Sequence, residues 1–156
     1  MARRAATEIV EASAQDIDGA AALFDAYRVF YRQTSDVPAA HAFLAERFRH
    51  KDAVLLIARH NGTAVGFVQL YPSLSSVSMK RIWILNDLYV ATGARRLGIG
   101  RRLMDAARDH AARTGAIRLE LTTEHNNTTA QALYERCGYV RDTVFYKYIL
   151  TVETKA

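Results

Sequence analysis

The chain has 156 residues, half of them hydrophobic and about a quarter charged, with a formal net charge of +5 at pH 7. This length suits one domain with a real core, so we take residues 1–156 as a single domain whose core spans about 7–150. The positive charge suits an anionic ligand, whereas no basic tail of the kind that binds nucleic acid stands out.

The sequence lacks the features of membrane-spanning, secreted, disulfide-bonded and metal-binding proteins. No apolar run approaches the ~20 residues of a membrane span, and no apolar stretch of a signal peptide follows the basic residues 1–4. The single cysteine, Cys137, leaves no internal disulfide and favours a reducing compartment, so we predict a cytoplasmic protein. The five histidines show no metal-ligand spacing, so we expect no metal.

The spacing of apolar residues, together with turn and cap residues, divides the chain into ten elements. Asn61-Gly62 is typical of a hairpin turn, Tyr71-Pro72 is expected to end or bend a strand, and Ser35 or Asp36 is a candidate helix cap. In chain order we expect a strand at 7–12, a helix from 17 to about 32, a helix through 43–48, strands at 53–58, 64–70 and 81–90, a helix from 99 to about 114, a strand at 117–122, a helix ending at 136, and a last strand at 143–150.

A glycine-rich turn between two of these elements organises the rest of the chain. An apolar strand ends at Val90, and a helix begins near Ile99. Glycine lets a ligand approach the main chain, and the first helical turn leaves N–H groups free at the positive end of the helix dipole. These features favour a phosphate or pyrophosphate site. The arginines that add positive charge here are Arg95, Arg96, Arg101 and Arg102.

The motif Arg95-x-x-Gly98-x-Gly100, directly after an apolar strand, resembles the signature loop of the GNAT superfamily of acetyl-CoA-dependent N-acetyltransferases. A nucleotide P-loop is absent, and the dinucleotide fingerprint needs a third glycine where this chain has Leu103. The alternative is an ordinary tight turn beside solvated arginines.

A second motif follows about thirty residues later. Asn127, Ala130, Tyr134 and Gly138-Tyr139 resemble the second GNAT signature, and the first three fall on one helix face. The resemblance covers about 7–150. It implies an α/β (α+β) GNAT fold, in which a mixed, strongly twisted central sheet of six to seven strands carries helices on both faces.

The resemblance also implies acetyl-CoA as the cosubstrate. Its pyrophosphate would lie on the backbone amides of residues 97–101, and its pantetheine would run along the preceding strand, which is usually bulged and splayed from the next. The expected contacts are Leu88, Tyr89, Val90, Arg95, Arg96, Leu97, Gly98, Ile99, Gly100, Arg101, Asn127, Ala130 and Tyr134.

In this family a primary amine attacks the thioester directly, so the resemblance implies a general acid and a base. Tyr134 is the expected acid, although it could instead be a core aromatic with a satisfied hydroxyl. Asp87 is the first candidate base, if a bulge turns it into the cleft; the alternative is a carboxylate bonded to backbone or to an arginine. Glu124 is the second candidate.

For the acceptor we expect Tyr31, Asp36, Asn86 and Glu124 to contribute, because acids and aromatics suit a small cationic amine. The strand at 83–90 is similar to strands in polyamine and lysine-analogue acetyltransferases, which favours a diamine, polyamine or amino acid. The alternative is that Tyr27 and Tyr31 only form the apolar stripe of their helix, and the sequence favours this interpretation for Tyr27.

The alternatives to this interpretation are a protein N-terminal or lysine acetyltransferase, a non-catalytic acetyl-CoA sensor, and a basic RNA-binding module. The sequence lacks the interleaved exposed aromatics that an RNA-binding module uses. We expect no nucleic-acid or membrane partner. A homodimer through the apolar edge at 145–150 is expected.

Overall fold

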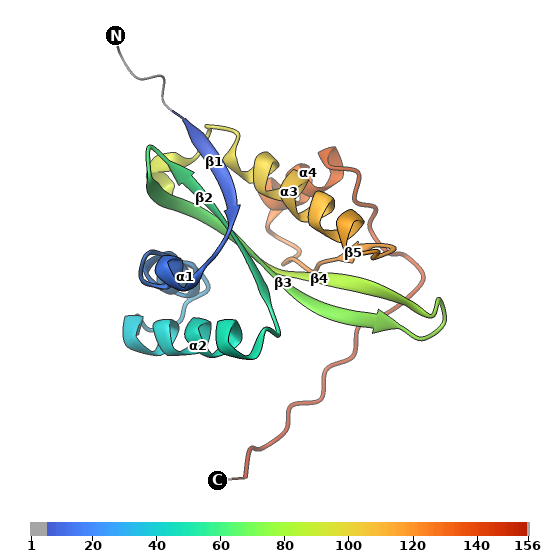
Figure 1. Ribbon diagram of the computed structural model, residues 1–156. Helices are drawn as coiled ribbons and strands as arrows, with labels where there is room; N and C mark the ends of the chain where they lie inside the picture. The colour runs from blue at the N-terminus through green and yellow to red at the C-terminus, as the bar shows by residue number, and fades with distance from the viewer. Residues whose placement is uncertain (1–5, 156) are drawn as a thin grey trace.

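The computed structural model describes residues 6–155, in which a first strand is followed by two helices, three strands, a helix, a short strand and a last helix (Figure 1). The basic residues 1–4 lie outside this described part. The strands are β1 (Thr7–Glu11), β2 (Val54–His60), β3 (Thr63–Ser75), β4 (Lys80–Val90) and β5 (Leu119–Glu120). The helices are α1 (Ile17–Phe30), α2 (Val37–His50), α3 (Ile99–Arg113) and α4 (Thr128–Arg136), with short 3-10 turns η1 (Ala14–Asp16) and η2 (Thr92–Ala94).

The strands form one mixed sheet in the order β1-β2-β3-β4-β5. The first four are antiparallel neighbours, and β5 runs parallel to β4. This confirms the mixed α/β fold with helices on both faces, but the expectation of six to seven strands is wrong, because the sheet has five among the described residues. Residues 143–150, the expected last strand, have no regular secondary structure.

Local sequence signals set several of these boundaries, and the turn at Asn61-Gly62 and the cap at Asp36 are as predicted. Asn61 and Gly62 both adopt left-handed backbone conformations, with φ of 51° and 81°, and join β2 to β3 in a tight turn. The carboxylate of Asp36 accepts the N–H of Ala39 at 3.1 Å and so caps α2. The carboxylate of Asp16 accepts the N–H of Ser13 at 2.8 Å at the start of the first helical segment.

Two strand lengths differ from the sequence prediction. Tyr71-Pro72 does not end β3, which pairs with β4 as far as Ser75. Beyond Leu70 the strand no longer pairs with β2, so Pro72 lies at a sheet edge, where a missing N–H is tolerated. In contrast, β5 has two residues instead of the six expected at 117–122.

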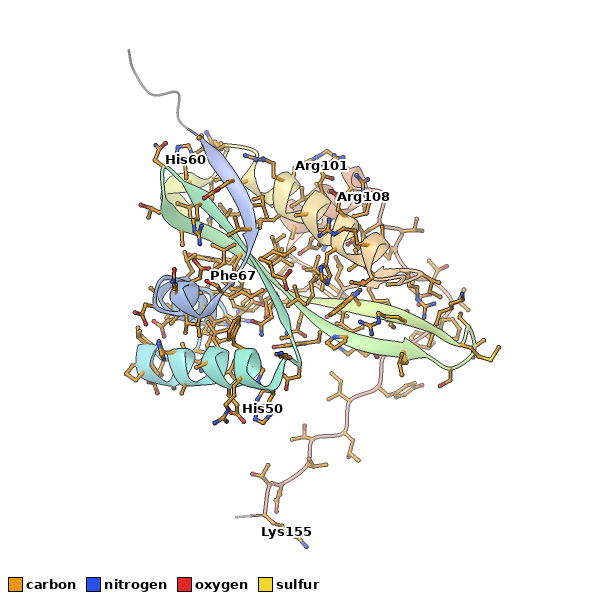
Figure 2. All side chains as sticks on the ribbon, in the orientation of Figure 1. His50, His60, Phe67, Arg101, Arg108 and Lys155 are labelled. Atoms are coloured by element: carbon orange, nitrogen blue, oxygen red, sulfur yellow. The ribbon has the colours of Figure 1, made fainter. Side chains whose placement is uncertain are left out.

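Each face of the sheet carries its own hydrophobic core. On one face α1 and α2 bury Ala20, Leu44 and Phe67, and Figure 2 shows Phe67 between the sheet and α1. On the other face α3 packs Leu103 and Met104 against the strands, and part of α4 joins this second core. Both faces are therefore covered, and the carboxyl end of β4 lies between the two helical layers.

The last part of the chain belongs to neither layer. After α4, Gly138 (φ 90°) ends the helix, because the N–H of Tyr139 bonds the carbonyl of Tyr134 at 3.0 Å. Figure 1 shows the red C-terminal segment leaving the body and extending away from the helices, and Figure 2 marks its end at Lys155.

Within residues 6–155, no helix has both the length and the hydrophobicity that crossing a membrane would require.

Candidate active site

The turn between β4 and α3 has an unusual backbone. Arg96 (φ 69°) and Gly98 (φ 71°) are left-handed, and Gly98 is the N-cap of α3. The N–H of Arg95 bonds the carbonyl of Thr92, and that of Arg102 bonds Gly98. For the amides of residues 96–101 between them, the described chain provides no main-chain acceptor. A row of free donors therefore lies at the positive end of α3.

Arg95 connects this turn to the end of β4. Its Nε donates to the carbonyl of Val90 at 3.2 Å, and its guanidinium lies 6.0 Å from the ring centroid of Tyr89. The neighbouring Arg96 and Leu97 are exposed. The turn thus presents positive charge and open main chain on the same surface.

Arg101 and Arg102 connect α3 to α4 and to β1 by hydrogen bonds. Arg101 pairs with Asp105 at 3.2 Å, and its Nη1 donates to the carbonyl of Arg136 at the end of α4 at 3.4 Å. Arg102 donates to the carbonyl of Thr7 in β1 at 2.7 Å. Figure 2 shows Arg101 on α3, one turn and more before Arg108. Both arginines have structural partners, and their positive charge stays near the helix start.

A bulge interrupts β4 where the ligand strand was expected to be irregular. Leu85 pairs with Leu70 and Asp87 pairs with Gln69, so Asn86 is an extra residue with no partner on β3. A bulge changes which face the following side chains occupy. As a result Asn86 is exposed while Asp87 is buried at 6 % exposure.

The strands β4 and β5 separate beyond this point. They pair only at Trp83 with Leu119 and at Ile84 with Glu120. From residue 85 to residue 90, β4 therefore has no strand partner on its β5 side in the described chain. We call this opening the β4–β5 splay, and its unpaired main chain can accept an extended ligand.

Asp87 is the one carboxylate buried at the splay. The side-chain amide of Asn86 donates to both of its oxygens at 3.2 Å, and no arginine or lysine of the described chain pairs with it. Burial raises the pKa of Asp87, against the opposing effect of the Asn86 amide and the Tyr27 hydroxyl. The alternative of an arginine-bound carboxylate is not what the structure shows.

Tyr27, for which the sequence favoured a place in the apolar stripe of its helix, is also a neighbour of Asp87. Its ring belongs to an aromatic cluster, 5.7 Å from Phe67 and 6.1 Å from Tyr89 between centroids. Burial and the adjacent Asp87 carboxylate raise the pKa of its hydroxyl, which therefore stays protonated. Tyr27 is both part of the apolar stripe of α1 and a polar neighbour of the carboxylate.

Tyr134 lies on α4 facing this region. It is half-buried, and burial raises the pKa of its hydroxyl to about 12, with a smaller effect from Tyr31. Tyr31 in turn interacts electrostatically with Asp87 and Glu124, so these four groups surround one region. At neutral pH the Tyr134 hydroxyl carries its proton and can donate it.

Asn127 and Ala130 hold the start of α4. The Asn127 side chain accepts the N–H of Ala130 at 3.4 Å and caps the helix, which is the structural role that the sequence allowed for it. A Cβ on Gly100 would come within 3.3 Å of the Leu133 side chain. Gly100 thus allows the first turn of α3 to approach α4 closely.

A pocket opens beside these groups. It has a volume of about 270 Å³, and the ion pair between Arg32 and Glu124, at 3.4 Å, crosses it. Both signs of charge are therefore available to a small polar ligand. The lining residues are Phe30, Tyr31, Arg32, Glu124, Asn126 and Asn127.

The structure separates the four residues expected at the acceptor. Tyr31 and Glu124 line the pocket. Asp36 instead caps α2, and Asn86 binds Asp87 from the bulge. Sequence reasoning missed Arg32, whose left-handed backbone (φ 65°) at the end of α1 carries it to the pocket; no motif in the sequence indicates this position.

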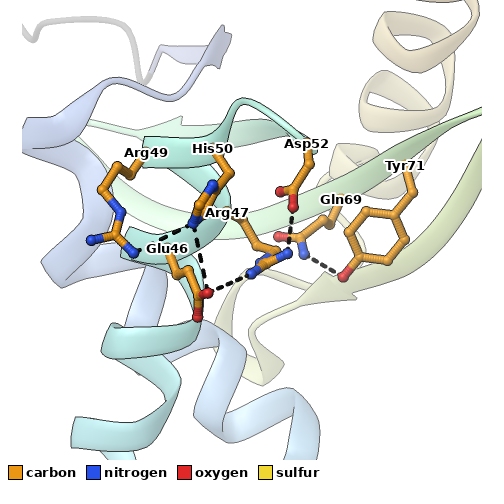
Figure 3. Close-up of polar contacts among 7 residues, drawn as sticks. All are labelled: Glu46, Arg47, Arg49, His50, Asp52, Gln69 and Tyr71. Carbon is orange, nitrogen blue, oxygen red and sulfur yellow. Dashed lines mark hydrogen bonds and ion pairs between the residues drawn. The ribbon is translucent and has the colours of Figure 1, made fainter.

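On β3 the residue opposite Asp87 is the polar Gln69, which already has a hydrogen-bond partner. Gln69, the register partner of Asp87, is buried and donates to the hydroxyl of Tyr71 at 2.6 Å (Figure 3). In the same view Arg47 of α2 pairs with Asp52 at 2.5 Å. One N–H of the Gln69 amide is used by Tyr71, and no hydrogen bond joins Gln69 to Asp87 in the described chain.

No set of three or more His, Cys, Asp and Glu side chains in the described ranges gathers into a possible metal site.

Comparison with known proteins places this geometry in context. Residues 20–139 match the model of the Acetyltransferase (GNAT) family. The uncharacterized N-acetyltransferase YhfO of Bacillus subtilis (strain 168) is 52% identical over 147 residues, which cover 94% of this chain and 99% of that protein. The D-amino-acid N-acetyltransferase HPA3 of Saccharomyces cerevisiae is 36% identical over 86 residues, covering 55% of this chain and 53% of HPA3.

Solved structures show the same fold. A crystal structure of a probable acetyltransferase superposes with a TM-score of 0.89 at 39% identity, covering 95% of this chain and 99% of the other. The aminoglycoside N-acetyltransferase AAC(6')-Iy, solved in complex with CoA, superposes with a TM-score of 0.77 at 18% identity, covering 95% and 98%. At that identity the second likeness shows the fold alone.

Proposed function

The chain belongs to the acetyltransferase (GNAT) family and is an acyltransferase, and from this premise we propose that it moves the acetyl group of acetyl-CoA to a primary amine of a small molecule. One observation carries the proposal. The free amides of residues 96–101, the splayed end of β4 and the buried Asp87 follow one another along a single stretch of chain, and Tyr31 links Asp87 electrostatically to Tyr134.

Placement of acetyl-CoA is the first task of this site. The pyrophosphate would accept hydrogen bonds from the amides at 97–101, at the positive end of α3. The pantetheine arm would lie in the splay and bond the main chain of Leu88, Tyr89 and Val90, which lacks a strand partner there. Arg95 stands between the two parts, and Asn127 and Ala130 border the ligand from α4.

Proton transfer is the second task. The amine must lose a proton before it attacks the thioester carbonyl; the C–N bond forms, the C–S bond breaks, and the departing thiolate takes a proton. Tyr134 suits the last step, because its pKa of about 12 keeps the hydroxyl protonated until a thiolate forms beside it. Holding the reactants in line contributes further, up to ~7–11 kcal/mol in the best cases.

Asp87 suits the role of base. Burial raises its pKa, which makes the carboxylate a stronger proton acceptor than an exposed aspartate. Only a neighbouring amide and Tyr27 stabilise its charge. Glu124 is the second candidate, but it is more exposed and already pairs with Arg32, so it fits better as a group that attracts the substrate ammonium.

The pocket favours an amino acid among the expected amines. Its ion pair offers Arg32 to a carboxylate and Glu124 to an ammonium group, whereas a diamine or polyamine has nothing to bind Arg32. The name of the yeast relative HPA3, a D-amino-acid N-acetyltransferase, supports the same class. A protein N-terminus or lysine is the second candidate.

A panel of amines tests the proposal. The chain is incubated with acetyl-CoA and L- and D-amino acids, diamines, polyamines and short peptides, while free thiol release and acetylated product are followed. We expect transfer to at least one amino acid, and weaker transfer when its carboxylate is amidated. Tight acetyl-CoA binding without transfer to any amine would instead indicate a sensor, and preference for peptides would indicate a protein acetyltransferase.

A further inference from the structure

Phe30, the last residue of α1, is a large apolar side chain at the edge of a charged pocket. It is 59% exposed, and its ring meets that of Tyr31 edge to face, with 5.3 Å between the centroids. A single exposed phenylalanine on a protein surface needs no explanation. Phe30, however, lines the same pocket as Arg32 and Glu124, so its ring borders space that a ligand can enter.

The end of α1 holds this side of the pocket in place. The N–H of Arg32, which has a left-handed backbone (φ 65°), bonds the carbonyl of Val29 at 2.9 Å. Beyond this turn, the carboxylate of Asp25 on α1 accepts the N–H of Asp36 at 2.7 Å and secures the loop. Phe30 and Arg32 are therefore presented from a fixed turn on either side of Tyr31.

The second wall of the pocket is held by α4. The side-chain amide of Gln131 donates to the carbonyls of Glu124 and His125, both at 3.0 Å. The N–H of Asn127 bonds the carbonyl of Glu124 at 3.1 Å. These bonds fix the backbone of Glu124, while its carboxylate pairs with Arg32 at 3.4 Å. Because both walls are formed before a ligand arrives, little ordering is needed on binding.

The pocket offers three different contacts at three positions. Arg32 can bind a carboxylate, Glu124 can bind an ammonium group, and Phe30 can cover hydrocarbon. An α-amino acid carries these three groups on one carbon atom. The pocket volume of about 270 Å³ lies just below the ~300–1,000 Å³ of pockets for drug-sized ligands, so it suits a molecule of this small size.

The ion pair between Arg32 and Glu124 selects a ligand that carries both charges. Its two side chains are 81% and 44% exposed, and ion pairs so open to solvent add little stability. A ligand with a carboxylate and an ammonium group gives each member of the pair a new partner of opposite charge. A ligand with one charge leaves either Arg32 or Glu124 without a new partner.

We propose that the acceptor is a free α-amino acid with a large apolar or aromatic side chain, and that Phe30 selects this side chain. The inference rests on the proposed acetyl transfer to a small amine and adds the class of side chain. Apolar side chains lose water when they pack on the Phe30 ring, which favours binding. A charged side chain would lose water there without gaining a partner, which disfavours acidic and basic amino acids.

The three contacts also select one handedness. If the carboxylate, the ammonium group and the side chain each have a position of their own, the mirror-image amino acid can satisfy only two of them while its amine points at the thioester. The amine lies on the side of Tyr31, whose hydroxyl interacts electrostatically with both Glu124 and Asp87. We therefore expect acetylation of one enantiomer to be clearly favoured.

A series of side chains tests the proposal. With wild-type protein and acetyl-CoA, kcat/KM is measured for both enantiomers of alanine, leucine, phenylalanine, glutamate and arginine. We expect leucine or phenylalanine to exceed alanine by at least about tenfold, glutamate and arginine to fall below alanine, and one enantiomer to exceed the other by at least about tenfold.

The outcomes separate this inference from the proposed function. Equal values for small and large side chains, or for the two enantiomers, would overturn the inference while acetyl transfer to amino acids still stands. Transfer only to diamines or polyamines would also overturn it and leave transfer to a small amine in place. Absence of transfer to every amine would overturn both.

Phe30→Ala tests the selecting residue. The ratio of kcat/KM for phenylalanine to that for alanine should fall at least about fivefold, and Phe30→Leu, which keeps an apolar side chain, should retain most of the ratio. The matched control is Phe48→Ala, at a phenylalanine of α2 that is 42% exposed and outside the pocket, and it should keep the ratio. Because the ratio compares two substrates of one enzyme, a loss of folded protein cancels. A wild-type ratio in Phe30→Ala would overturn the role of Phe30.

Arg32→Gln tests the carboxylate contact. The wild type should prefer phenylalanine to phenylalanine amide by at least about tenfold in kcat/KM, and Arg32→Gln should bring this ratio close to one. Arg113→Gln removes the same charge from the last turn of α3, outside the pocket, and should keep the wild-type ratio. An Arg32→Gln variant that retains the full preference for the free carboxylate would contradict binding of a zwitterion.

Discussion

Two aspartates in different regions of this molecule are almost inaccessible to solvent, and their pKa values shift in opposite directions. Asp25, at the α1–α2 junction, is 7% exposed, and Asp87, at the β4–β5 splay, is 6% exposed. Asp25 accepts the Ser35 hydroxyl and the N–H of Asp36, both at 2.7 Å, and these bonds lower its pKa. Asp87 has the Asn86 side-chain amide at 3.2 Å and the Tyr27 hydroxyl as neighbours, and burial raises its pKa.

The difference follows from what each region does. At the junction every bond to Asp25 also orients the loop that leads into α2, so the charge serves stability. At the splay a bulge and a missing strand pairing leave both main chain and carboxylate short of partners. Departures from regular structure are most common at functional sites. Here the bulge and the missing strand pairing lie where we propose that the reaction takes place.

The largest effect should come from Tyr134→Phe. Removing the hydroxyl removes the proposed proton donor to the thiolate, so kcat should fall by about 10³-fold, within the usual range for a general acid. The Kd for acetyl-CoA, measured by calorimetry, should change less than about twofold, since the ring remains.

Tyr139→Phe is the matched control for this change. Its hydroxyl is buried, and its pKa is also raised to about 12, but Tyr139 follows the end of α4. It should keep kcat within a few-fold of the wild type. If kcat falls equally in Tyr134→Phe and Tyr139→Phe, Tyr134 is not the general acid.

Asp87→Asn should have the next largest effect. Transfer needs the deprotonated carboxylate, and because burial raises its pKa, kcat/KM should fall as pH drops through a value above the ordinary 3.8. The variant should lose about 10²-fold in kcat/KM, since water or Glu124 can partly replace the base, and its acidic limb should disappear. Glu124→Gln is the control and should retain the acidic limb of the pH profile of kcat/KM. If this acidic limb survives in Asp87→Asn, Asp87 is not the base.

The same substitution should stabilise the fold at neutral pH. A raised folded pKa means that folding favours the proton, so the native carboxylate weakens stability once pH exceeds the unfolded value of 3.8. The amide side chain of the variant has no charge to bury, and its advantage in urea unfolding should vanish as pH falls below about 3.8. A loss of stability at pH 7 would indicate that Asp87 is a structural carboxylate like Asp25.

Much of the fold could be predicted because its signals are local. The Asn61-Gly62 turn, the Asp36 cap and the left-handed Gly98 each depend on a few neighbouring residues, and the structure has all three. The length of β3 could not be predicted, because Pro72 is tolerated only where β2 has already ended, which is a property of the sheet.

Residues 143–150 show the limit of local reasoning most clearly. They have the apolar pattern of a strand but no regular secondary structure, because strand pairing depends on a neighbouring strand as well as on local sequence. At the site, the bulge at Asn86 decides that Asp87 is buried, and only the register with β3 reveals it. Arg32 was missed because a backbone turn, with no motif, brings it to Glu124.

Asp25→Ala should affect stability and leave catalysis alone. It leaves the Asp36 N–H and the Ser35 hydroxyl without their acceptor, so the melting temperature should fall by several degrees while kcat/KM at a permissive temperature stays within about twofold. Because the pKa of Asp25 is lowered in the folded protein, this loss should begin to shrink as pH falls below the unfolded value of 3.8 and should shrink further until the native carboxyl is protonated at its lower pKa. Asp18→Ala, on the exposed face of the same helix, is the control.

The smallest predicted effect is that of Gly98→Ala. A Cβ there would meet no atom within 4 Å, so the cost is that of a left-handed backbone, about 1 kcal/mol for a residue other than glycine. If the amides at 96–101 hold the pyrophosphate only in this conformation, the Kd for acetyl-CoA should rise about fivefold while kcat is kept. Gly93→Ala, in the same turn, with open space and no left-handed φ, should change neither quantity. Unchanged binding in Gly98→Ala would mean that acetyl-CoA is held by the splay and by Arg95, and that the turn only joins β4 to α3.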